Sequence, residues 1–305
     1  MGEKDLTEKI LEDYNDVFAD IINGLIFQGE QVIRPEKLEN ASVHSLYKAE
    51  GTKMHEQERD TAKYWNGSER IRLAILGVEN QTAIDPMMPV RVIGYDGASY
   101  RKQMQERVKD IVPVITIVLH FGTERRWDKS THLRDLLKIP KEWPSYIEEY
   151  LNDYHFHVFD IAFLNDEEIA RFHSDFRIVA NYFQKKHENE DYIPDDETEF
   201  THVDEVLKLL SAMSGDGGYA RLIQADADRK ELKCMKDVTK HIREIGEKEG
   251  ELRGELRGEK NGTIKFCVDL IKDGVLSLQA AAERLNMSER EFINSANKLG
   301  LKIGR

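Results

Sequence analysis

Three polar residues end an apolar segment that has the composition of a buried strand. Residues 73–78 read LAILGV, and Glu79, Asn80 and Gln81 follow them directly. Because successive side chains of a strand point to opposite faces, Glu79 and Gln81 lie on one side and Asn80 on the other. The segment therefore predicts a carboxylate and an amide aimed at one place at the end of a core strand.

A second carboxylate, that of Asp60, stands nineteen residues before Glu79. This separation allows two neighbouring strands to bring both carboxylates together, where they repel each other unless a cation lies between them. Mg²⁺ prefers oxygen ligands, keeps several waters and lowers the pKa of a bound water that attacks a phosphodiester. The spacing suggests a metal site of Asp60, Glu79 and the Asn80 backbone carbonyl, with the Gln81 amide orienting the attacking water.

The same residues also have a purely structural interpretation. A glutamate at a strand end is often exposed to solvent, and a glutamine two residues later can be its surface neighbour. Motifs of this size occur frequently by chance, so the spacing alone leaves both interpretations open.

The surrounding segments predict an α/β core with a partly parallel sheet flanked by helices. Apolar runs predict buried strands at 69–81, 112–122 and 155–164. Helical spacing predicts a helix from a capping box at Asp5 and Glu8 to Leu25, another after Pro89, and a third over 166–186.

The chain beyond residue 187 changes character and predicts an α-helical extension. An acidic stretch opens residues 188–262, which form a linker and a helical spacer with glycine at every fourth position from 246 to 262. Residues 263–305 resemble a helix-turn-helix unit whose helices begin at Ser277 and Ser288. The predicted parts are therefore 1–187, 188–262 and 263–305, with homo-oligomer formation through the C-terminal helices as a further expectation.

Composition and charge exclude several classes of protein. The net charge of -13 disfavours a generally basic nucleic-acid coat, although it is compatible with a local groove whose acids are neutralised by metal ions. Two distant cysteines, no visible signal peptide and no apolar run long enough for a membrane helix favour a cytoplasmic protein without membrane association. Two histidines in HFH (155–157) lack an obvious third metal ligand, and HEQER (55–59) lacks the second histidine of a zincin.

Several blocks in a fixed order resemble the recombination-promoting nuclease/putative transposase (Rpn) family of the PD-(D/E)XK nuclease superfamily. The resemblance covers roughly residues 10 to 185 and rests on these blocks: YNDVFADIIN (14–23), ERDTAKYW (58–65), AILGVENQT (74–82), MPVRVIGYDGASY (88–100), VPVITIVLHFGTERRW (112–127) and VFDIAFL (158–164). It implies a restriction-endonuclease-like α/β core with the family's Arg91 and Tyr95 on one helix, and Gly122 and Trp127 after a strand.

The resemblance also implies an activity, namely Mg²⁺- or Mn²⁺-dependent endonuclease cleavage of DNA in support of recombination. It makes Asp60 and Glu79 metal ligands and lets Asp16, in the first helix, orient a metal-bound water. Gln81 stands where the superfamily has lysine, so Arg72, Arg91 or Lys102 would have to supply a positive charge, and Arg59 stands where proline precedes the aspartate.

Two alternatives remain at this stage. The acidic charge and the helical tail fit a catalytically inactive interaction or DNA-associated protein that keeps the nuclease fold as a scaffold. A transcription regulator that reads DNA with residues 263–305 is disfavoured, because Glu289 and Glu291 would repel phosphate.

Overall fold

The computed structural model describes residues 10–41, 44–48, 54–58, 60–67, 72–224 and 232–303. The chain forms two compact units, Met1–Thr239 and Lys240–Arg305. The three-part division at residues 187 and 262 stays a prediction. The capping box at Asp5 and Glu8 lies outside the described residues.

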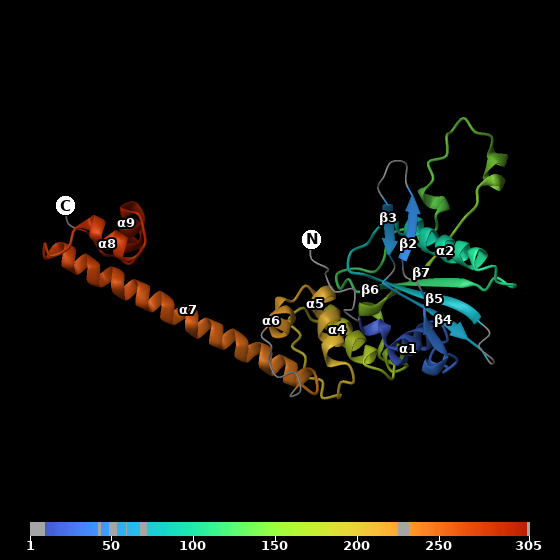
Figure 1. Ribbon diagram of the computed structural model, residues 1–305, viewed down its shortest axis with the longest axis horizontal. Coiled ribbons are helices and arrows are strands. Elements are labelled where there is room, and N and C mark those ends of the chain that lie inside the picture. The colour runs from blue at the N-terminus through green and yellow to red at the C-terminus, as the bar shows by residue number, and fades with distance from the viewer. Residues whose placement is uncertain are drawn as a thin grey trace. The chain divides into compact units, whose positions relative to one another are not determined.

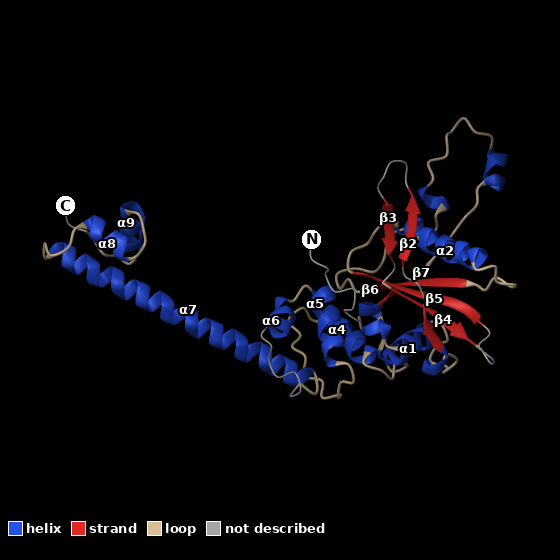
Figure 2. Ribbon diagram, in the orientation of Figure 1, coloured by secondary structure: helices blue, strands red, loops and turns tan. Residues whose placement is uncertain are grey.

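A five-stranded mixed sheet forms the centre of the first unit, as Figures 1 and 2 show. Its order is β1-β4-β5-β6-β7, in which β1, β4 and β5 are antiparallel and β5, β6 and β7 are parallel. The strands are β1 (Leu38–Asn40), β4 (Thr61–Asn66), β5 (Arg72–Gln81), β6 (Val114–His120) and β7 (His157–Asp160). A separate hairpin pairs β2 (His44–Lys48) with β3 (Met54–Glu58). The predicted α/β core is confirmed.

Helices cover both faces of the sheet (Figure 1). On one face, Met88 and Val92 of α2 (Met88–Gln105) pack against Val118 of β6. On the other face lie α1 (Asn15–Leu25) and α4 (Phe176–Glu188), and Phe183 of α4 contacts Phe121 just after β6. None of the helices in the described ranges combines the length and apolar character needed to cross a membrane.

The first helix begins later than predicted. A 3-10 turn, η1 (Leu11–Asp13), precedes α1, and Tyr14 between them has an extended backbone. The Asp13 carboxylate accepts the N–H of Ile10 and the hydroxyl of Thr61, which holds this turn against β4. The apolar spacing continues through the turn, so periodicity alone could not reveal the break.

Two other predicted elements are also shorter than expected. The strand predicted to reach residue 164 ends at Asp160, and the buried residues Ile161 and Ala162 continue in a 3-10 turn, η6 (Ile161–Phe163). The helix predicted over 166–186 is divided into α3 (Asp166–Ile169) and α4. The buried carboxylate of Asp20 accepts the N–H groups of His173 and Ser174 between them, and this long-range contact replaces a helical turn.

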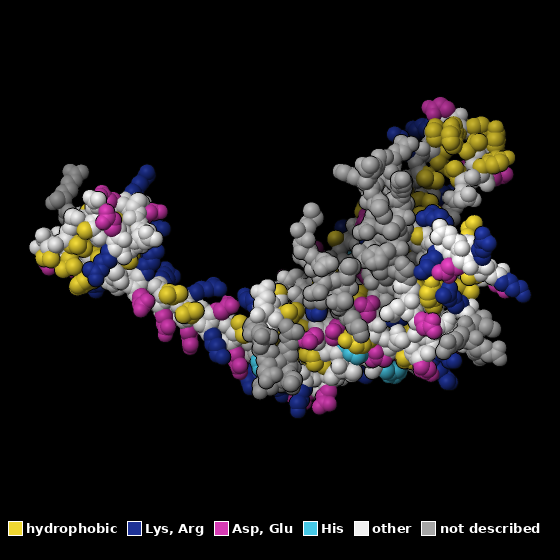
Figure 3. All heavy atoms as spheres, viewed as in Figure 1, with side chains coloured by type: hydrophobic (Ala, Val, Ile, Leu, Met, Phe, Trp, Pro, Cys, Tyr) yellow, Lys and Arg dark blue, Asp and Glu magenta, His cyan; other side chains and the backbone are white. Residues whose placement is uncertain are grey.

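The connection between β6 and β7 is irregular and exposes apolar side chains. It contains the 3-10 turns η4 (Arg134–Leu136) and η5 (Ser145–Tyr150). Its exposed large side chains are Leu137, Ile139, Trp143, Tyr146 and Tyr150. Figure 3 shows hydrophobic side chains gathered over this segment. The segment thus adds apolar surface to the first unit, since these side chains are not part of the core.

Helices complete the first unit and form the second. The first unit contains α5 (Val203–Ser214), which ends at Gly215 with a left-handed φ of 70°, and α6 (Gly217–Gln224). The helix α7 (Met235–Lys272) includes the glycine repeat and leads into α8 (Leu278–Arg284) and α9 (Glu289–Lys298). Ser277 caps α8, and Ser288 with Glu291 forms the capping box of α9, as predicted.

A small core holds the second unit together. Ile264, Cys267 and Val268 of α7 pack with Ala281, Ala282, Phe292 and Ala296 of the helix pair. Cys267 is completely buried, so it serves this core as a small apolar side chain.

Two helical glycines allow a matched test of packing in the first unit. A Cβ at Gly24 in α1 would lie 2.4 Å from the buried ring of Phe172, whereas a Cβ at Gly97 in α2 meets no atom within 4 Å. We expect Gly24→Ala to lower the free energy of unfolding by about 1–3 kcal/mol through overpacking. Gly97→Ala should raise it by up to about 1 kcal/mol through helix propensity. Urea unfolding of both variants gives the comparison, and equal effects would contradict the packing of α1 against Phe172.

Candidate active site

Two carboxylates lie at the same end of neighbouring strands. The antiparallel register of β4 and β5 pairs Thr61 with Val78, so the next residues outward are Asp60 and Glu79. The Asp60 carboxylate is exposed and accepts the backbone N–H of Asn80 at 2.7 Å, whereas Glu79 is only 1% exposed. The structure therefore brings Asp60, Glu79 and Asn80 together at this end of the sheet.

Glu79 lies in a network that α2 supplies. The Arg91 guanidinium forms an ion pair with Glu79 Oε1 and a second ion pair with Asp85 at 3.3 Å. The Tyr95 hydroxyl donates to Glu79 Oε1 at 3.4 Å, and the Gln81 amide donates to the same oxygen at 3.3 Å. Arg91 and Tyr95 are four residues apart, so one face of α2 presents both to the strand end.

This network fixes the charges around Glu79. Burial alone would lower the pKa of Arg91, but the hydrogen bond with Tyr95 and the charge of Glu79 outweigh it and raise that pKa. Burial, and then the negative charge of Glu79, raise the pKa of the Tyr95 phenol. Arg91 is therefore a permanent cation, and Tyr95 is a neutral donor.

Of the three candidate cations, Arg91 is the one that contacts Glu79. Arg72 pairs with Glu106 at 3.1 Å and lies over the Tyr64 ring at the opposite end of β5. Lys102 lies 3.9 Å from the same glutamate, Glu106.

On the other face of β5, Glu12 of η1 supports Asn80. The Asn80 side-chain amide donates to Glu12 Oε1 at 2.9 Å. Glu12 is completely buried, and burial raises its pKa to about 7, with a further increase from the negative charge of Asp60. Within the described part of the chain, Glu12 Oε2 and Asn80 Oδ1 have no hydrogen-bond partner. Buried polar oxygens without partners are costly, so this oxygen-rich corner has capacity for another ligand.

Asp16 lies apart from these contacts. Its carboxylate is half exposed and lies 3.1 Å from the Nε2 atom of His202, whose ring stacks on Tyr14. Among the described residues that precede β1, Glu12 is the carboxylate that reaches Asn80. The water-orienting role of Asp16 stays a prediction.

A histidine and an aspartate lie next to Gln81 at the carboxyl ends of the parallel strands, and the three residues form a polar row. Parallel register places Gln81 beside His120 and His120 beside Asp160. His120 Nδ1 lies 2.7 Å from Asp160 Oδ1, which also accepts the N–H of Trp127 at 2.8 Å. Burial would raise the pKa of Asp160, but the contacts with His120 and the Trp127 amide outweigh it and lower that pKa.

Sequence reasoning missed Glu12 and His120. The signal for His120 was available, because this polar residue follows the mainly apolar segment 114–119, as Glu79 follows the apolar segment 73–78. No comparable signal marked Glu12, which lies within the apolar spacing assigned to the first helix.

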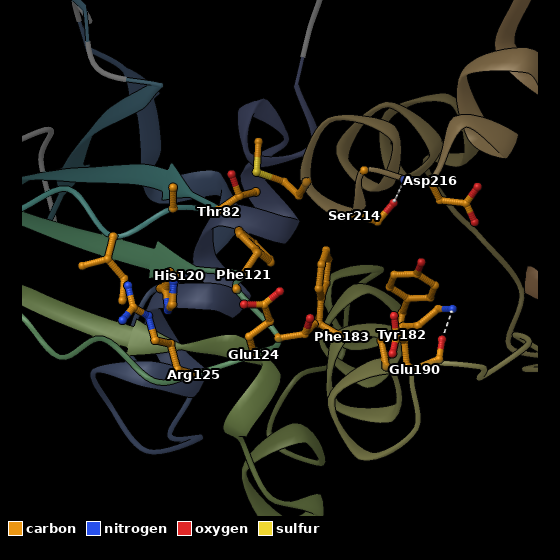
Figure 4. Close-up of a pocket in the computed structure, with 17 residues that line it drawn as sticks. Thr82, His120, Phe121, Glu124, Arg125, Tyr182, Phe183, Glu190, Ser214 and Asp216 are labelled. Atoms are coloured by element: carbon orange, nitrogen blue, oxygen red, sulfur yellow. Dashed lines mark hydrogen bonds between the residues drawn. The ribbon is translucent and has the colours of Figure 1, made fainter.

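A cavity of about 750 Å³ opens beyond the carboxyl ends of β5 and β6 (Figure 4). Four segments line it, namely residues 82–84 after β5, residues 120–125, residues 182–190 in and just after α4, and residues 213–216 at the end of α5 and in the turn to α6. His120 is the residue that belongs both to the polar row and to the cavity wall.

The donor set at the strand ends suits a hard cation. The carboxylates of Asp60 and Glu79 and the backbone carbonyl of Asn80 all offer oxygen atoms, and Mg²⁺ needs only one or two carboxylates because it keeps several waters. Within the described ranges, no three His, Cys, Asp or Glu side chains converge on a common metal position. An ion would therefore have to be completed by water or substrate, and it would compete with Arg91 for Glu79.

The buried Glu12 carboxyl makes the metal-free protein sensitive to pH. Because its pKa is raised above the ordinary 4.5 to about 7, the folded state binds the extra proton between these values. The contribution of Glu12 to the free energy of unfolding is fully present below pH 4.5. As the pH rises through 7 this contribution is lost, which lowers the free energy of unfolding by about 3 kcal/mol. Glu12→Gln, which keeps an oxygen for Asn80, should lose less stability than wild type between pH 5 and pH 8 in urea unfolding with EDTA.

The exposed residue Glu30 gives a matched control for this titration, because Glu30→Gln makes the same change of charge. It should retain the pH dependence of wild type. Identical pH profiles for wild type and Glu12→Gln would contradict the raised pKa of Glu12.

Comparison with known proteins finds a family that part of the chain matches. Residues 74–211 match the family described as "Putative transposase, YhgA-like", which belongs to the Rpn/PD-(D/E)XK-like group. The match begins in β5 and extends into α5, so it contains Glu79, Gln81, Arg91, Tyr95, His120 and Asp160. No curated protein and no solved structure gives a significant match. Residues 74–211, less than half of the chain, are thus similar to the YhgA-like putative transposase family of the Rpn/PD-(D/E)XK-like group, in agreement with the resemblance of the sequence.

Proposed function

We propose that this protein is a Mg²⁺-dependent DNA endonuclease that promotes recombination, with Mn²⁺ as an alternative metal. The observation that carries the proposal is the juxtaposition of Asp60 and Glu79 at the ends of β4 and β5. The match of residues 74–211 to a putative transposase family agrees with chemistry on DNA.

Asp60, Glu79 and the backbone carbonyl of Asn80 would hold the metal ion. When bound, Mg²⁺ supplies an activated water and stabilises charge on the phosphodiester. Glu12 would act as a positioning residue, because its bond to the Asn80 side chain fixes the residue that offers the carbonyl.

Side chains of the protein would orient the attacking water and stabilise the negative charge of the phosphate. Gln81 has no charge, but its amide is held by Glu79 and has a second hydrogen available for the attacking water. Arg91 is 35% exposed and permanently charged, so it can take the electrostatic role that lysine has in the superfamily name. Tyr95 stays neutral and restrains Glu79.

Association of two copies through the C-terminal helices belongs to the same proposal. In α7, Leu252 and Leu256 are exposed four residues apart, and a Cβ at Gly250, Gly254 or Gly258 would meet no described atom within 4 Å. The two leucines form an exposed apolar strip on which the helix of a second copy can pack, and the glycines, two positions away, lie on the opposite side of α7.

The alternative function is a non-catalytic interaction protein built on the nuclease fold. The observation in its favour is that Arg91 already neutralises the buried Glu79, so the fold is electrostatically satisfied without a metal. The two functions differ in what they predict for metal binding.

Supercoiled plasmid tests the nuclease directly. Wild type with Mg²⁺ or Mn²⁺ should nick it, and Asp60→Asn or Glu79→Gln should reduce the rate by at least about 100-fold, since metal stabilisation of a transition state is worth several kcal/mol. Glu106→Gln, which alters an exposed glutamate at the far end of β5, is the matched control and should keep the wild-type rate. Absence of nicking by wild type, or equal nicking by all variants, would exclude the catalytic role.

Thermal unfolding separates the two functions without measuring cleavage. A cation that binds only the folded state at 100 times its Kd adds about 2.7 kcal/mol of stability. We expect Mg²⁺ to raise the Tm of wild type and of Glu106→Gln, and to leave the Tm of Asp60→Asn unchanged. A metal-independent Tm in wild type would favour the non-catalytic alternative.

A further inference from the structure

The cavity beyond the carboxyl ends of β5 and β6 has the volume of a small-molecule binding site. Its volume of about 750 Å³ is within the range of about 300–1,000 Å³ that is typical of small-molecule pockets. The lining residues come from four segments of the first unit that are distant in sequence. Figure 4 shows Thr82, His120, Phe121 and Glu124 on one part of the wall and Tyr182, Phe183, Ser214 and Asp216 on another.

The cavity lies within reach of the candidate catalytic residues. Thr82 lines it and follows Glu79 by three residues, which span at most about 11 Å. At about 3.4 Å of rise for each nucleotide, this distance corresponds to about three nucleotides of a DNA strand. A strand with a phosphate at Asp60 and Glu79 can therefore place a nearby base in the cavity.

The lining chemistry suits a base better than a phosphate. Arg125 and Lys186 bring positive charge, but Glu124, Glu190 and Asp216 bring more negative charge. A bare phosphate would be repelled by this balance, whereas the edge of a nucleobase carries both donors and acceptors. Phe121, Tyr182 and Phe183 also line the cavity, and although each is only 1–3% exposed, their ring edges give this part of the wall an apolar surface next to which a base can lie.

His120 adds a fixed polar atom to the wall. Asp160 holds its Nδ1 atom, and a Cβ at position 122 would lie 2.6 Å from its Nε2 atom. Gly122 is thus required beside this imidazole, because any side chain there would clash with Nε2. His120 is only 1% exposed, so its ring forms a rigid part of the wall next to Gly122.

We propose that this cavity binds an unpaired base of a DNA strand whose neighbouring phosphate lies at Asp60 and Glu79. The substrate class is then DNA with an unpaired segment, such as a single-stranded tail, a gap or an extruded base. In a fully paired duplex the base must first be unstacked, at a cost of a few kcal/mol, whereas an unpaired base avoids this cost. The inference rests on the proposed nuclease function for its choice of ligand.

Binding to DNA in EDTA, where cleavage is prevented, tests the proposal. We compare a blunt duplex with a duplex of the same number of nucleotides that carries a short single-stranded tail with 2-aminopurine. Wild type should bind the tailed duplex at least tenfold more tightly by fluorescence anisotropy, and the 2-aminopurine emission should change on binding. Equal affinities, or an unchanged emission, would overturn the proposal.

A cavity-filling variant localises the effect. Ala83 is exposed and lines the cavity, so Ala83→Trp fills it without disturbing the core. This variant should bind the tailed duplex as weakly as the blunt one. Ala212→Trp is the matched control, because Ala212 is exposed on α5 but does not line the cavity, and it should keep the preference. Retention of the preference in Ala83→Trp would show that the base binds elsewhere.

The proposed nuclease and the proposed base site can fail separately. If the protein prefers tailed DNA in EDTA but never nicks plasmid, the proposed base site stands and the proposed nuclease activity is excluded. A protein that nicks plasmid through Asp60 and Glu79 without any preference for tails would retain the nuclease and lose the base site.

Discussion

The buried charge of Glu79 is the constraint on which the rest of the first unit depends. A carboxylate that is 1% exposed costs several kcal/mol unless a positive partner and hydrogen bonds compensate it. Arg91 and Tyr95 provide that compensation from one face of α2, so α2 has to lie along this end of β5. Met88 and Val92, in the first turns of the same helix, hold it there by packing on Val118 of β6. The polar network and the apolar packing therefore fix the same helix position.

Sequence reasoning predicted the parts of the fold that local pattern determines. The apolar strands β5 and β6 and the helices α2, α8 and α9 follow from periodicity and caps. The pairing of Asp60 with Glu79 could be anticipated because Asp60 directly precedes a short strand and Glu79 follows the apolar residues of the next strand, at a suitable distance along the chain. The errors came where a distant polar side chain decides the backbone, as Asp20 does when it accepts two N–H groups between α3 and α4. A single sequence contains no signal for such a contact.

A distant polar contact also explains why the sequence analysis missed Glu12 and named Asp16 as a site residue. An uninterrupted helix would have placed both residues on regular faces, and Asp16 was the one that the family resemblance marked. The 3-10 turn at Leu11–Asp13 changes the direction of the chain, so Glu12 is buried against Asn80 whereas Asp16 faces His202. The break arises from Asp13, which binds Thr61 forty-eight residues later. The identity of the supporting carboxylate thus depends on tertiary structure.

The contacts around Glu79 give a physical reason for glutamine instead of lysine at position 81. A lysine there would bring a second cation next to Glu79, beside the guanidinium of Arg91. Two cations on one buried carboxylate would oppose a divalent ion by like-charge repulsion, whereas the neutral amide adds a hydrogen bond without charge. Under the proposed function, a lysine at position 81 and Arg91 are therefore alternative sources of the positive charge beside Glu79. Because this chain has that charge on α2, a neutral glutamine on β5 is physically favoured.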